Sequence, residues 1–205
     1  AWSMVEVDVS GLVRARAIMR PDFERAHAIP LTYLPFVARS VAKALRDNPR
    51  INARWGGDHI KLNNQVNLGI AVSTEKGLIV PVVHDAGALS VTALAVAIQK
   101  LIQSARLGSL RIEQVRDGTF TLNNTGALGS VASMPIINSP EAAIMTTETI
   151  VKRPVVVEGD AIAVRSMMNV CLTFDHRICD GAEASVFLQS VKTSLEAIDE
   201  RMSLD

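Results

Sequence analysis

The sequence is poor in cysteine and has no long apolar run. Only two of its 205 residues are cysteine, Cys171 and Cys179, and neither belongs to a CxxC pair or a Cys/His cluster with metal spacing. A disulfide framework and a structural metal site are therefore not expected, and a reducing compartment is favoured. No run approaches the roughly 20 apolar residues that span a bilayer. The N-terminus also lacks a basic-then-apolar signal pattern.

The chain also lacks excess charge of either sign and has few aromatic residues. Its 21 basic and 21 acidic residues give a formal net charge of zero. Neither nucleic acid nor an anionic membrane is therefore expected as a partner, and self-association is mildly favoured. Aromatic residues make up 4% and hydrophobic residues 48% of the chain. The core must then be built from Ala, Val, Ile and Leu, which is ordinary for a mixed α/β protein.

Hydrophobic periodicity predicts strands and helices that mix without strict alternation. Period-2 alternation or apolar runs predict strands over 2–9, 66–72, 78–83, 119–122, 142–150, 155–164 and 168–174, with a hairpin tip at 158–160. Helical spacing predicts a short helix capped by Ser10 that ends before Pro21, and longer helices over 32–48, 90–107 and 182–200. Pro81 argues that its strand lies at an edge or a bulge. This order favours a two-layer α/β sandwich with a mixed β-sheet in one domain, residues 1–205, over a doubly wound sheet.

The richest concentration of ionisable groups is the stretch FDHRICDGAEA, residues 174–184. A buried strand here ends in Asp175-His176-Arg177, and a helix begins near Asp180-Gly181, at the kind of junction where α/β proteins place their sites. Structural roles compete with chemical ones, because Asp180 with Glu183 fits a capping box and Asp175 with Arg177 fits an ion pair. We interpret the other histidines as structural: His27, His59 and His84.

The HRICDG segment resembles the His-x-x-x-Asp-Gly signature of dihydrolipoamide acyltransferases and chloramphenicol acetyltransferase. The resemblance extends, in the same order, through AWSMVEVDVSGLVRAR, LGIAVSTEKGLIVPVV, TFTLNNTGALGS, PIINSPEAAI and VKRPVV. These pieces cover nearly the whole chain, which is similar to the catalytic core of the acyltransferase of a 2-oxoacid dehydrogenase complex. The resemblance implies the coenzyme A-dependent acyltransferase fold and an acyl exchange between a dihydrolipoyl thiol and coenzyme A.

The resemblance assigns roles to the residues of the signature. An alkyl thiol with a pKa of about 8.5 is well matched by an imidazole base of pKa about 6.5, so His176 is expected to be the general base. Asp180 is expected to support the site or to stabilise charge near the intermediate. Asp175 and Arg177 are expected to orient and brace the turn, with Gly181 as a further supporting residue of the motif.

The family supplies a serine or threonine hydroxyl after the TFT strand to stabilise the tetrahedral oxyanion, and here that position is Asn123. An asparagine amide can also donate a hydrogen bond, and Thr125 follows two residues later. Asn123 is the first candidate donor and Thr125 the second. We interpret Asn124 as a turn-forming residue. Gly126 and Gly129 are expected to serve the same turn by allowing close backbone approach.

The resemblance also implies an assembly. In the family the site lies between subunits of a trimer, with the histidine from one chain and the oxyanion donor from its neighbour, and trimers build cubic or dodecahedral cores. The lipoyl domain with its lipoyl group, and the small domain that docks the decarboxylase and dihydrolipoamide dehydrogenase, have no counterpart in this segment. The family core usually begins upstream of Ala1, so an N-terminally truncated core domain is expected. The expected location is the bacterial cytoplasm, with the mitochondrial matrix as the alternative.

The acyl group and two rival functions stay open at this level. The NNTG turn resembles bacterial branched-chain acyltransferases, which favours branched-chain over acetyl or succinyl groups. One rival is an acetyltransferase of the same fold acting on a small hydroxylated substrate, and the other is a non-catalytic oligomeric scaffold, which the missing hydroxyl would suit. A serine hydrolase is excluded because no GxSxG elbow is present.

Overall fold

The computed structural model describes residues 1–205, and its centre is a long strand, β11 (Ile162–Phe174), that pairs with three others. The main sheet has seven strands in the order β1 (Trp2–Asp8), β11, β9 (Ala143–Thr147), β8 (Phe120–Asn124), β4 (Leu68–Ile70) and β7 (Val82–Val83), with β10 (Val151–Val156) paired to the first half of β11. The β4–β8 and β8–β9 pairs are parallel and the others are antiparallel. The predicted mixed sheet is confirmed.

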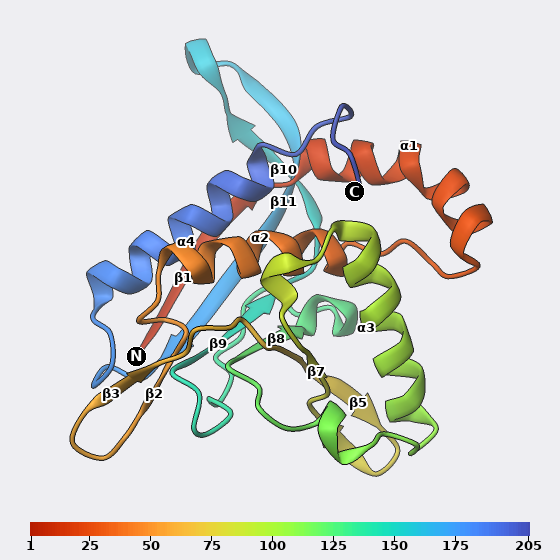
Figure 1. Cartoon of the computed structure of the whole chain (residues 1–205). Helices are drawn as coiled ribbons and strands as arrows, with labels where there is room; N and C mark the ends of the chain where they lie inside the picture. The colour runs from red at the N-terminus through yellow and green to blue at the C-terminus, as the bar shows by residue number, and fades with distance from the viewer.

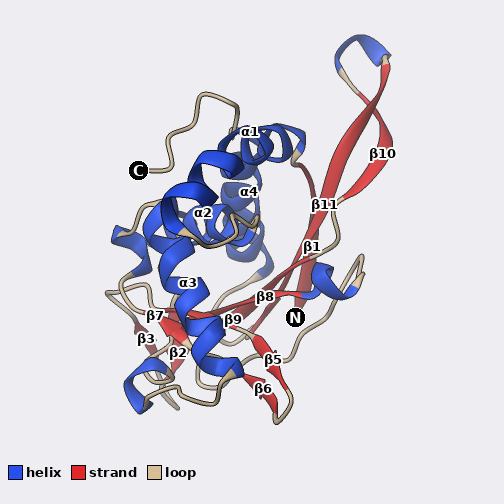
Figure 2. Cartoon of the chain, turned by 90° about the vertical axis from the view of Figure 1, so that its right-hand side faces the viewer, coloured by secondary structure: helices blue, strands red, loops and turns tan.

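The helices form the second layer, on one face of the sheet (Figures 1 and 2). They are α1 (Ser10–His27), α2 (Leu34–Asp47), α3 (Val91–Arg106) and α4 (Gly181–Glu196). Ser90 caps α3, the helix predicted over 90–107, because its hydroxyl oxygen accepts a hydrogen bond from the backbone N–H of Ala93 at 3.2 Å. The two-layer sandwich is therefore confirmed. No helix combines the length and the apolar character that crossing a bilayer would require.

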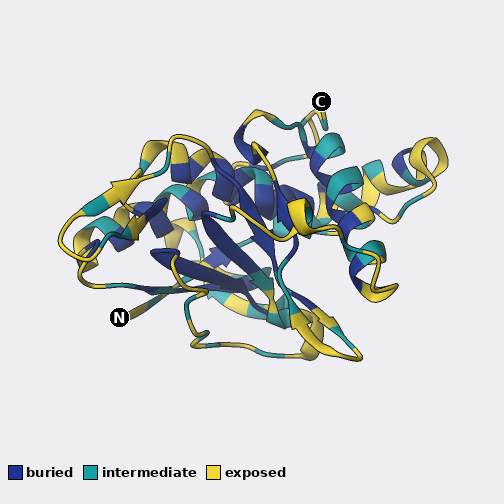
Figure 3. Cartoon of the chain, turned by 60° about the horizontal axis from the view of Figure 1, so that its bottom comes forward, coloured by how far each residue is buried: buried dark blue, intermediate teal, exposed yellow.

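The core lies where the sheet meets the helices, and a cluster of 41 buried residues fills it. Figure 3 shows the buried residues concentrated along this boundary. Successive side chains of a strand point to opposite faces, so Phe120 and Leu122 of β8 enter the core while Thr121 and Asn123 face the other way. A strap (residues 130–140) lies over part of that second face, held by hydrogen bonds of 2.8 Å from the side chains of Trp2 and Asn169 to its carbonyl groups.

Smaller elements surround the sheet. Two hairpins are separate from it: β2 (Ala53–Trp55) with β3 (Ile60–Leu62), and β5 (Val72–Thr74) with β6 (Gly77–Ile79). Four short 3₁₀ turns complete the chain: η1 (Ala86–Ala88), η2 (Ile112–Gln114), η3 (Thr125–Leu128) and η4 (Glu158–Asp160). The predicted hairpin tip at 158–160 is confirmed as η4, at the end of a β10–β11 arm that projects from the body of the molecule (Figure 1).

The prediction for the first helix was wrong. Helix α1 continues through Pro21 to His27, because a proline removes only one helical hydrogen bond and the burial of Phe23 stabilises the turn that follows. Ser10 is not its N-cap either. Its hydroxyl oxygen accepts a hydrogen bond from the backbone N–H of Ser166 at 2.9 Å, so this side chain fastens the helix start to β11.

The two strands predicted over 66–72 and 78–83 are each divided. Residues 68–70 and 82–83 join the main sheet as β4 and β7, whereas residues 72–74 and 77–79 pair with each other as a separate hairpin. Leu78, at the start of the second apolar run, is 69% exposed at that hairpin. Because β7 forms an edge of the sheet, the edge position that Pro81 predicts is confirmed, and the carbonyl of Pro81 accepts a hydrogen bond from Ile70 N–H at 2.8 Å.

Candidate active site

The His176 turn (residues 175–180) connects β11 to α4. Its start is fixed by a 2.8 Å hydrogen bond from the backbone N–H of Asp175 to the carbonyl of Ala142, and it closes where Ile178 N–H donates to the carbonyl of Asp175 at 2.9 Å. The imidazole of His176 is exposed and packs against the ring of Phe174, with centroids 5.8 Å apart. The side-chain hydrogen bonds of this turn are made by its other residues, so the histidine nitrogens remain available for chemistry.

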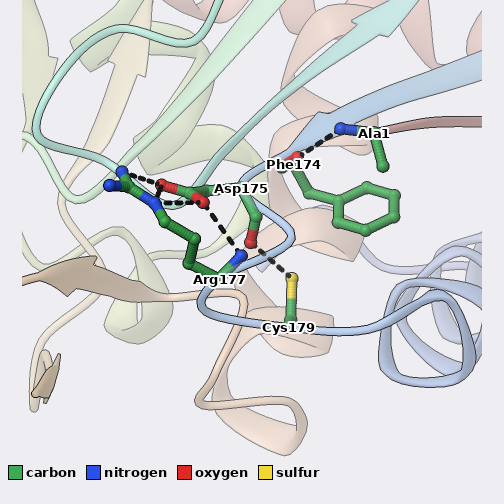
Figure 4. Close-up of polar contacts among 5 residues, drawn as sticks. All are labelled: Ala1, Phe174, Asp175, Arg177 and Cys179. Carbon is green, nitrogen blue, oxygen red and sulfur yellow. Dashed lines mark hydrogen bonds and ion pairs between the residues drawn. The ribbon is translucent and has the colours of Figure 1, made fainter.

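Asp175 and Arg177 form the ion pair that their sequence allows (Figure 4). Arg177 Nε and Nη2 donate to Asp175 Oδ1 and Oδ2 at 3.0 and 2.6 Å, and the arginine backbone N–H adds a bond of 3.0 Å. The guanidinium holds the pKa of the Asp175 carboxyl below its usual value. Arg177 also lies over the ring of Trp55, 5.1 Å from its centroid. Both side chains thus brace the turn beside His176.

Asp180 and Gly181 begin helix α4. Asp180 Oδ1 accepts a hydrogen bond from Glu183 N–H at 2.9 Å, and Glu183 Oε2 accepts one from Asp180 N–H at 3.0 Å, so the capping box is present. A Cβ on Gly181 would meet no atom within 4 Å, so packing within this chain does not require glycine there. The negative charge of Asp180 lies at a helix N-terminus, where the helix dipole stabilises it.

One further residue of this region, Arg50, could not be found from the sequence. Arg50, just beyond α2, donates from Nε and Nη2 to the carbonyl of Ile178 at 3.0 and 2.6 Å and pairs with Glu183 at 2.9 Å. An exposed arginine 128 positions from Ile178 gives no local signal of this contact. Cys179 is 1% exposed, and burial raises the pKa of its thiol to about 11, so the thiol stays protonated and unreactive.

The Asn123 turn (residues 123–129) lies at the carboxyl end of β8. The strand extends through Asn124, two residues beyond its predicted end. Asn123 is half-buried on the sheet face opposite the helices, and its amide is not among the hydrogen-bonded side chains of the turn. Asn124 accepts a hydrogen bond from Ala127 N–H at 3.3 Å, which confirms its turn-forming role.

The conformation of the turn explains why both positions are glycine. A Cβ on Gly126 would lie 2.3 Å from the carbonyl carbon of Glu148, so only glycine allows this approach. Gly129 ends η3 with φ at +85°, a left-handed conformation that glycine adopts readily. The expected close backbone approach is confirmed at Gly126.

Thr125 has its hydroxyl engaged. Its Oγ1 donates to Glu148 Oε2 at 2.8 Å, and Ser133 Oγ lies 3.1 Å from Thr125 Oγ1. A hydroxyl carries one proton, so Thr125 has none left for a substrate oxyanion in this arrangement. Of the two candidate donors, the geometry therefore favours Asn123.

Within one chain, the Asn123 turn and the His176 turn lie toward opposite ends of the sheet. Asn123 is level with Thr146 on β9, and Thr146 is level with Cys171 on β11. Phe174, where β11 ends, is three residues further on, or roughly 10 Å along the strand, and His176 lies beyond that end. The histidine and the amide of one chain are therefore not brought together.

Each end of the sheet has a cavity beside it. A polar cavity of about 490 Å³ lies near the His176 turn, and its wall includes Glu141, whose carboxyl pKa is raised by burial. An apolar cavity of about 310 Å³ lies beside the Asn123 turn and is lined by Tyr33, Val37 and Met168 among others. Neither cavity is lined by His176 or Asn123. No group of three or more His, Cys, Asp or Glu side chains is placed to hold a metal ion.

A mixed sheet covered by helices on one face, with an exposed His-x-x-x-Asp-Gly turn at a strand-to-helix junction, defines the class of chloramphenicol acetyltransferase-like folds. A solved chloramphenicol acetyltransferase superposes with a TM-score of 0.61 over 95% of this chain and 87% of that one at 15% identity, which shows the fold alone. The chain belongs to the 2-oxoacid dehydrogenases acyltransferase (catalytic domain) family, whose family model matches residues 1–203.

Curated relatives include components of three kinds of complex. The lipoamide acyltransferase component of the branched-chain alpha-keto acid dehydrogenase complex of Bacillus subtilis is 45% identical over 204 residues, all of this chain and 48% of the relative. The succinyltransferase component of the 2-oxoglutarate dehydrogenase complex of Bartonella vinsonii is 43% identical over 98% of this chain and 48% of the relative. The acetyltransferase component of the pyruvate dehydrogenase complex of Mycobacterium bovis is also 43% identical, over 93% of this chain and 36% of the relative. The chain thus spans about half or less of the length of these relatives.

Two solved structures share both fold and sequence. A probable dihydrolipoamide acetyltransferase from Listeria monocytogenes has a TM-score of 0.98 at 45% identity, over all of this chain and 88% of that one. The Azotobacter vinelandii dihydrolipoamide acetyltransferase has a TM-score of 0.93 at 29% identity, over 97% of this chain and 82% of that one. Its structure was studied for the roles of a serine, a histidine and an asparagine in its catalytic mechanism.

Proposed function

We propose that residues 1–205 are the catalytic core domain of a dihydrolipoamide acyltransferase, which transfers an acyl group between a dihydrolipoyl thiol and coenzyme A. The observation that carries this proposal is the exposed, unbonded His176 in a braced strand-to-helix turn of the family signature. We favour a branched-chain acyl group, supported by the NNTG turn and by the Bacillus subtilis relative. Acetyl and succinyl relatives of nearly equal identity are the alternatives.

The residues suit a thiol-to-thiol exchange. His176 takes the proton of the coenzyme A thiol, and the thiolate sulfur forms a bond to the thioester carbon of the acyl-dihydrolipoyl group. The resulting oxyanion accepts a hydrogen bond from the Asn123 amide. When the tetrahedral intermediate collapses, the bond from carbon to the dihydrolipoyl sulfur breaks, and that sulfur recovers the proton from His176. Acyl-coenzyme A and the free dihydrolipoyl thiol are the products.

The remaining residues of the turn support the base. Asp180 places a carboxylate four residues after His176, the spacing of the signature, and we assign it the stabilisation of charge near the intermediate. The Asp175–Arg177 pair and the bonds from Arg50 to the carbonyl of Ile178 hold the turn in one conformation. Such bracing matters because a misplacement of about 1 Å lowers a rate about 10²-fold.

The separation of His176 from Asn123 supports a site shared between subunits. We propose a homotrimer in which the His176 turn of one subunit faces the Asn123 turn of its neighbour. The pyruvate dehydrogenase multienzyme complex has a cubic core of solved structure, with a TM-score of 0.93 to this chain, and a cubic or dodecahedral assembly is proposed here by analogy. Lipoyl domain, decarboxylase and dihydrolipoamide dehydrogenase are the proposed partners, and the bacterial cytoplasm is the proposed location.

The test is acyl transfer to dihydrolipoamide from acetyl-, succinyl-, isobutyryl- and isovaleryl-coenzyme A. Turnover with a preference for the branched donors is expected, and His176→Ala should lose about 10²–10⁴-fold in kcat. The matched control is His27→Ala, an exposed histidine at the end of α1, which should retain wild-type kcat. An assembled but inactive protein would favour the scaffold. Acetylation of a hydroxylated acceptor in place of dihydrolipoamide would favour the rival acetyltransferase.

A further inference from the structure

Glu148, just after β9, is a buried carboxylate that hydroxyl groups solvate. Only 3% of its surface is exposed. Thr125 Oγ1 and Ser133 Oγ donate to its Oε2 at 2.8 and 3.2 Å, and Thr146 Oγ1 donates to its Oε1 at 2.7 Å. Burial alone would raise the pKa of Glu148, but the hydroxyl hydrogen bonds outweigh it and lower the pKa, so the group is ionised near neutral pH.

These hydrogen bonds join three parts of the chain at one point. Thr125 begins the η3 turn, Ser133 belongs to the strap, and Thr146 belongs to β9. The residue after Glu148 adds a further bond, because Thr149 Oγ1 donates to the backbone carbonyl of Gly126 at 2.9 Å. Thr125 and Gly126, two and three residues after Asn123, are therefore both held in place by hydrogen bonds to the segment after β9.

We propose that Glu148 is a positioning residue for the oxyanion donor: by holding the Thr125 hydroxyl it fixes the Asn123 turn, so that the Asn123 amide is presented to the substrate. This inference rests on the proposed function above. It also gives Thr125 a role, since the threonine acts through its bond to Glu148 and not as a donor to the oxyanion.

The proposal predicts a particular kinetic signature. Glu148→Gln keeps the shape of the side chain but removes its charge, so the hydrogen bond from Thr125 is no longer charge-assisted, and an NH₂ group in place of Oε2 leaves both Thr125 and Ser133 without their acceptor. A turn fixed less well should lower kcat about tenfold, the equivalent of one hydrogen bond, and leave KM nearly unchanged. The loss should be a constant factor from pH 6 to 9, because Glu148 is ionised throughout this range.

The experiment measures kcat, KM and Tm across pH for the wild type, Glu148→Gln, Thr125→Val and their double variant. The double variant should lose no more than either single variant, because both act through one hydrogen bond. Thr121→Val is the matched control. Thr121 lies on β8, on the same face of the sheet as Asn123, and its hydroxyl donates at 2.6 Å to another buried carboxylate, Glu141, away from the Asn123 turn. It should lower Tm similarly and keep wild-type kcat.

Three results would overturn the proposal. Unchanged kcat in Glu148→Gln with a lower Tm would make its role structural, and independent losses in the two single variants would place them in separate interactions. A loss in Thr125→Val as large as in Asn123→Ala would make Thr125 the oxyanion donor. If Glu148→Gln fails to fold, Thr125→Val breaks the same bond and decides. A wild type with no turnover overturns the proposed function as well, whereas an active wild type with unaffected variants overturns only the role of Glu148.

Discussion

The His176 turn and the Asn123 turn each begin where a strand of the same sheet ends, but they are held in different ways. The His176 turn is held from outside, by the Asp175–Arg177 pair at the surface and by Arg50. The Asn123 turn is held from inside, by the buried carboxylate of Glu148. An exposed ion pair is screened by water, whereas a buried charged group must keep its partners. The two halves of the proposed site should therefore respond differently to mutation.

The largest effect that sharpens this comparison is expected at the Asn123 turn. Asn123→Ala removes the proposed oxyanion donor and should lower kcat by about 10²–10³-fold. Its neighbour gives the control, because Asn124→Ala removes only the cap of a short 3₁₀ turn and should lower Tm slightly with kcat nearly retained. Steady-state kinetics of both variants measure the difference. Equal losses would mean that the turn conformation matters and the Asn123 amide does not.

Mixing subunits that each lack one of the two residues tests whether the His176 turn and the Asn123 turn meet between subunits. Asn123→Ala and His176→Ala should each be nearly inactive, but co-expressed in equal amounts they should form mixed trimers with intact sites. Random mixing gives about one quarter of the wild-type activity, since a working site needs a His176 donor subunit beside an Asn123 donor subunit. Differently tagged subunits verify that mixed trimers form. Mixed trimers without restored activity would show that both residues act within one chain.

A smaller effect is expected at the brace of the His176 turn. Arg50→Gln removes the charged donor of two hydrogen bonds to the Ile178 carbonyl and the ion pair to Glu183, so the histidine is held less well. About a tenfold loss of kcat is expected, with little change in Tm because the pair is exposed. Lys43→Gln, the same change of charge at an exposed position of α2, should match the wild type. Equal kcat in both variants would contradict the bracing role.

Contacts between residues close together in the chain could be predicted from the sequence. The capping box of Asp180 and Glu183 spans three residues, and the Asp175–Arg177 pair spans two, so both could be predicted from neighbouring letters. The mixed two-layer fold followed from periodicity and from the resemblance. The local pattern predicted the wrong end for the first helix, because the burial of Phe23 stabilises the turn after Pro21. It also predicted two continuous strands over 66–83, whereas each of these runs divides between the main sheet and a separate hairpin.

The sequence by itself determined the family and the layers of the fold and led to the proposal of His176 as the base in its signature turn, because these depend on periodicity and on residues close together in the chain. Only the tertiary structure decided which of Asn123 and Thr125 keeps a free donor, and which residues hold each turn. Glu148 is 23 positions from Thr125, and Arg50 is 128 from Ile178. Hydrogen bonds depend on proximity in space, and only the folded sheet brings such distant side chains together.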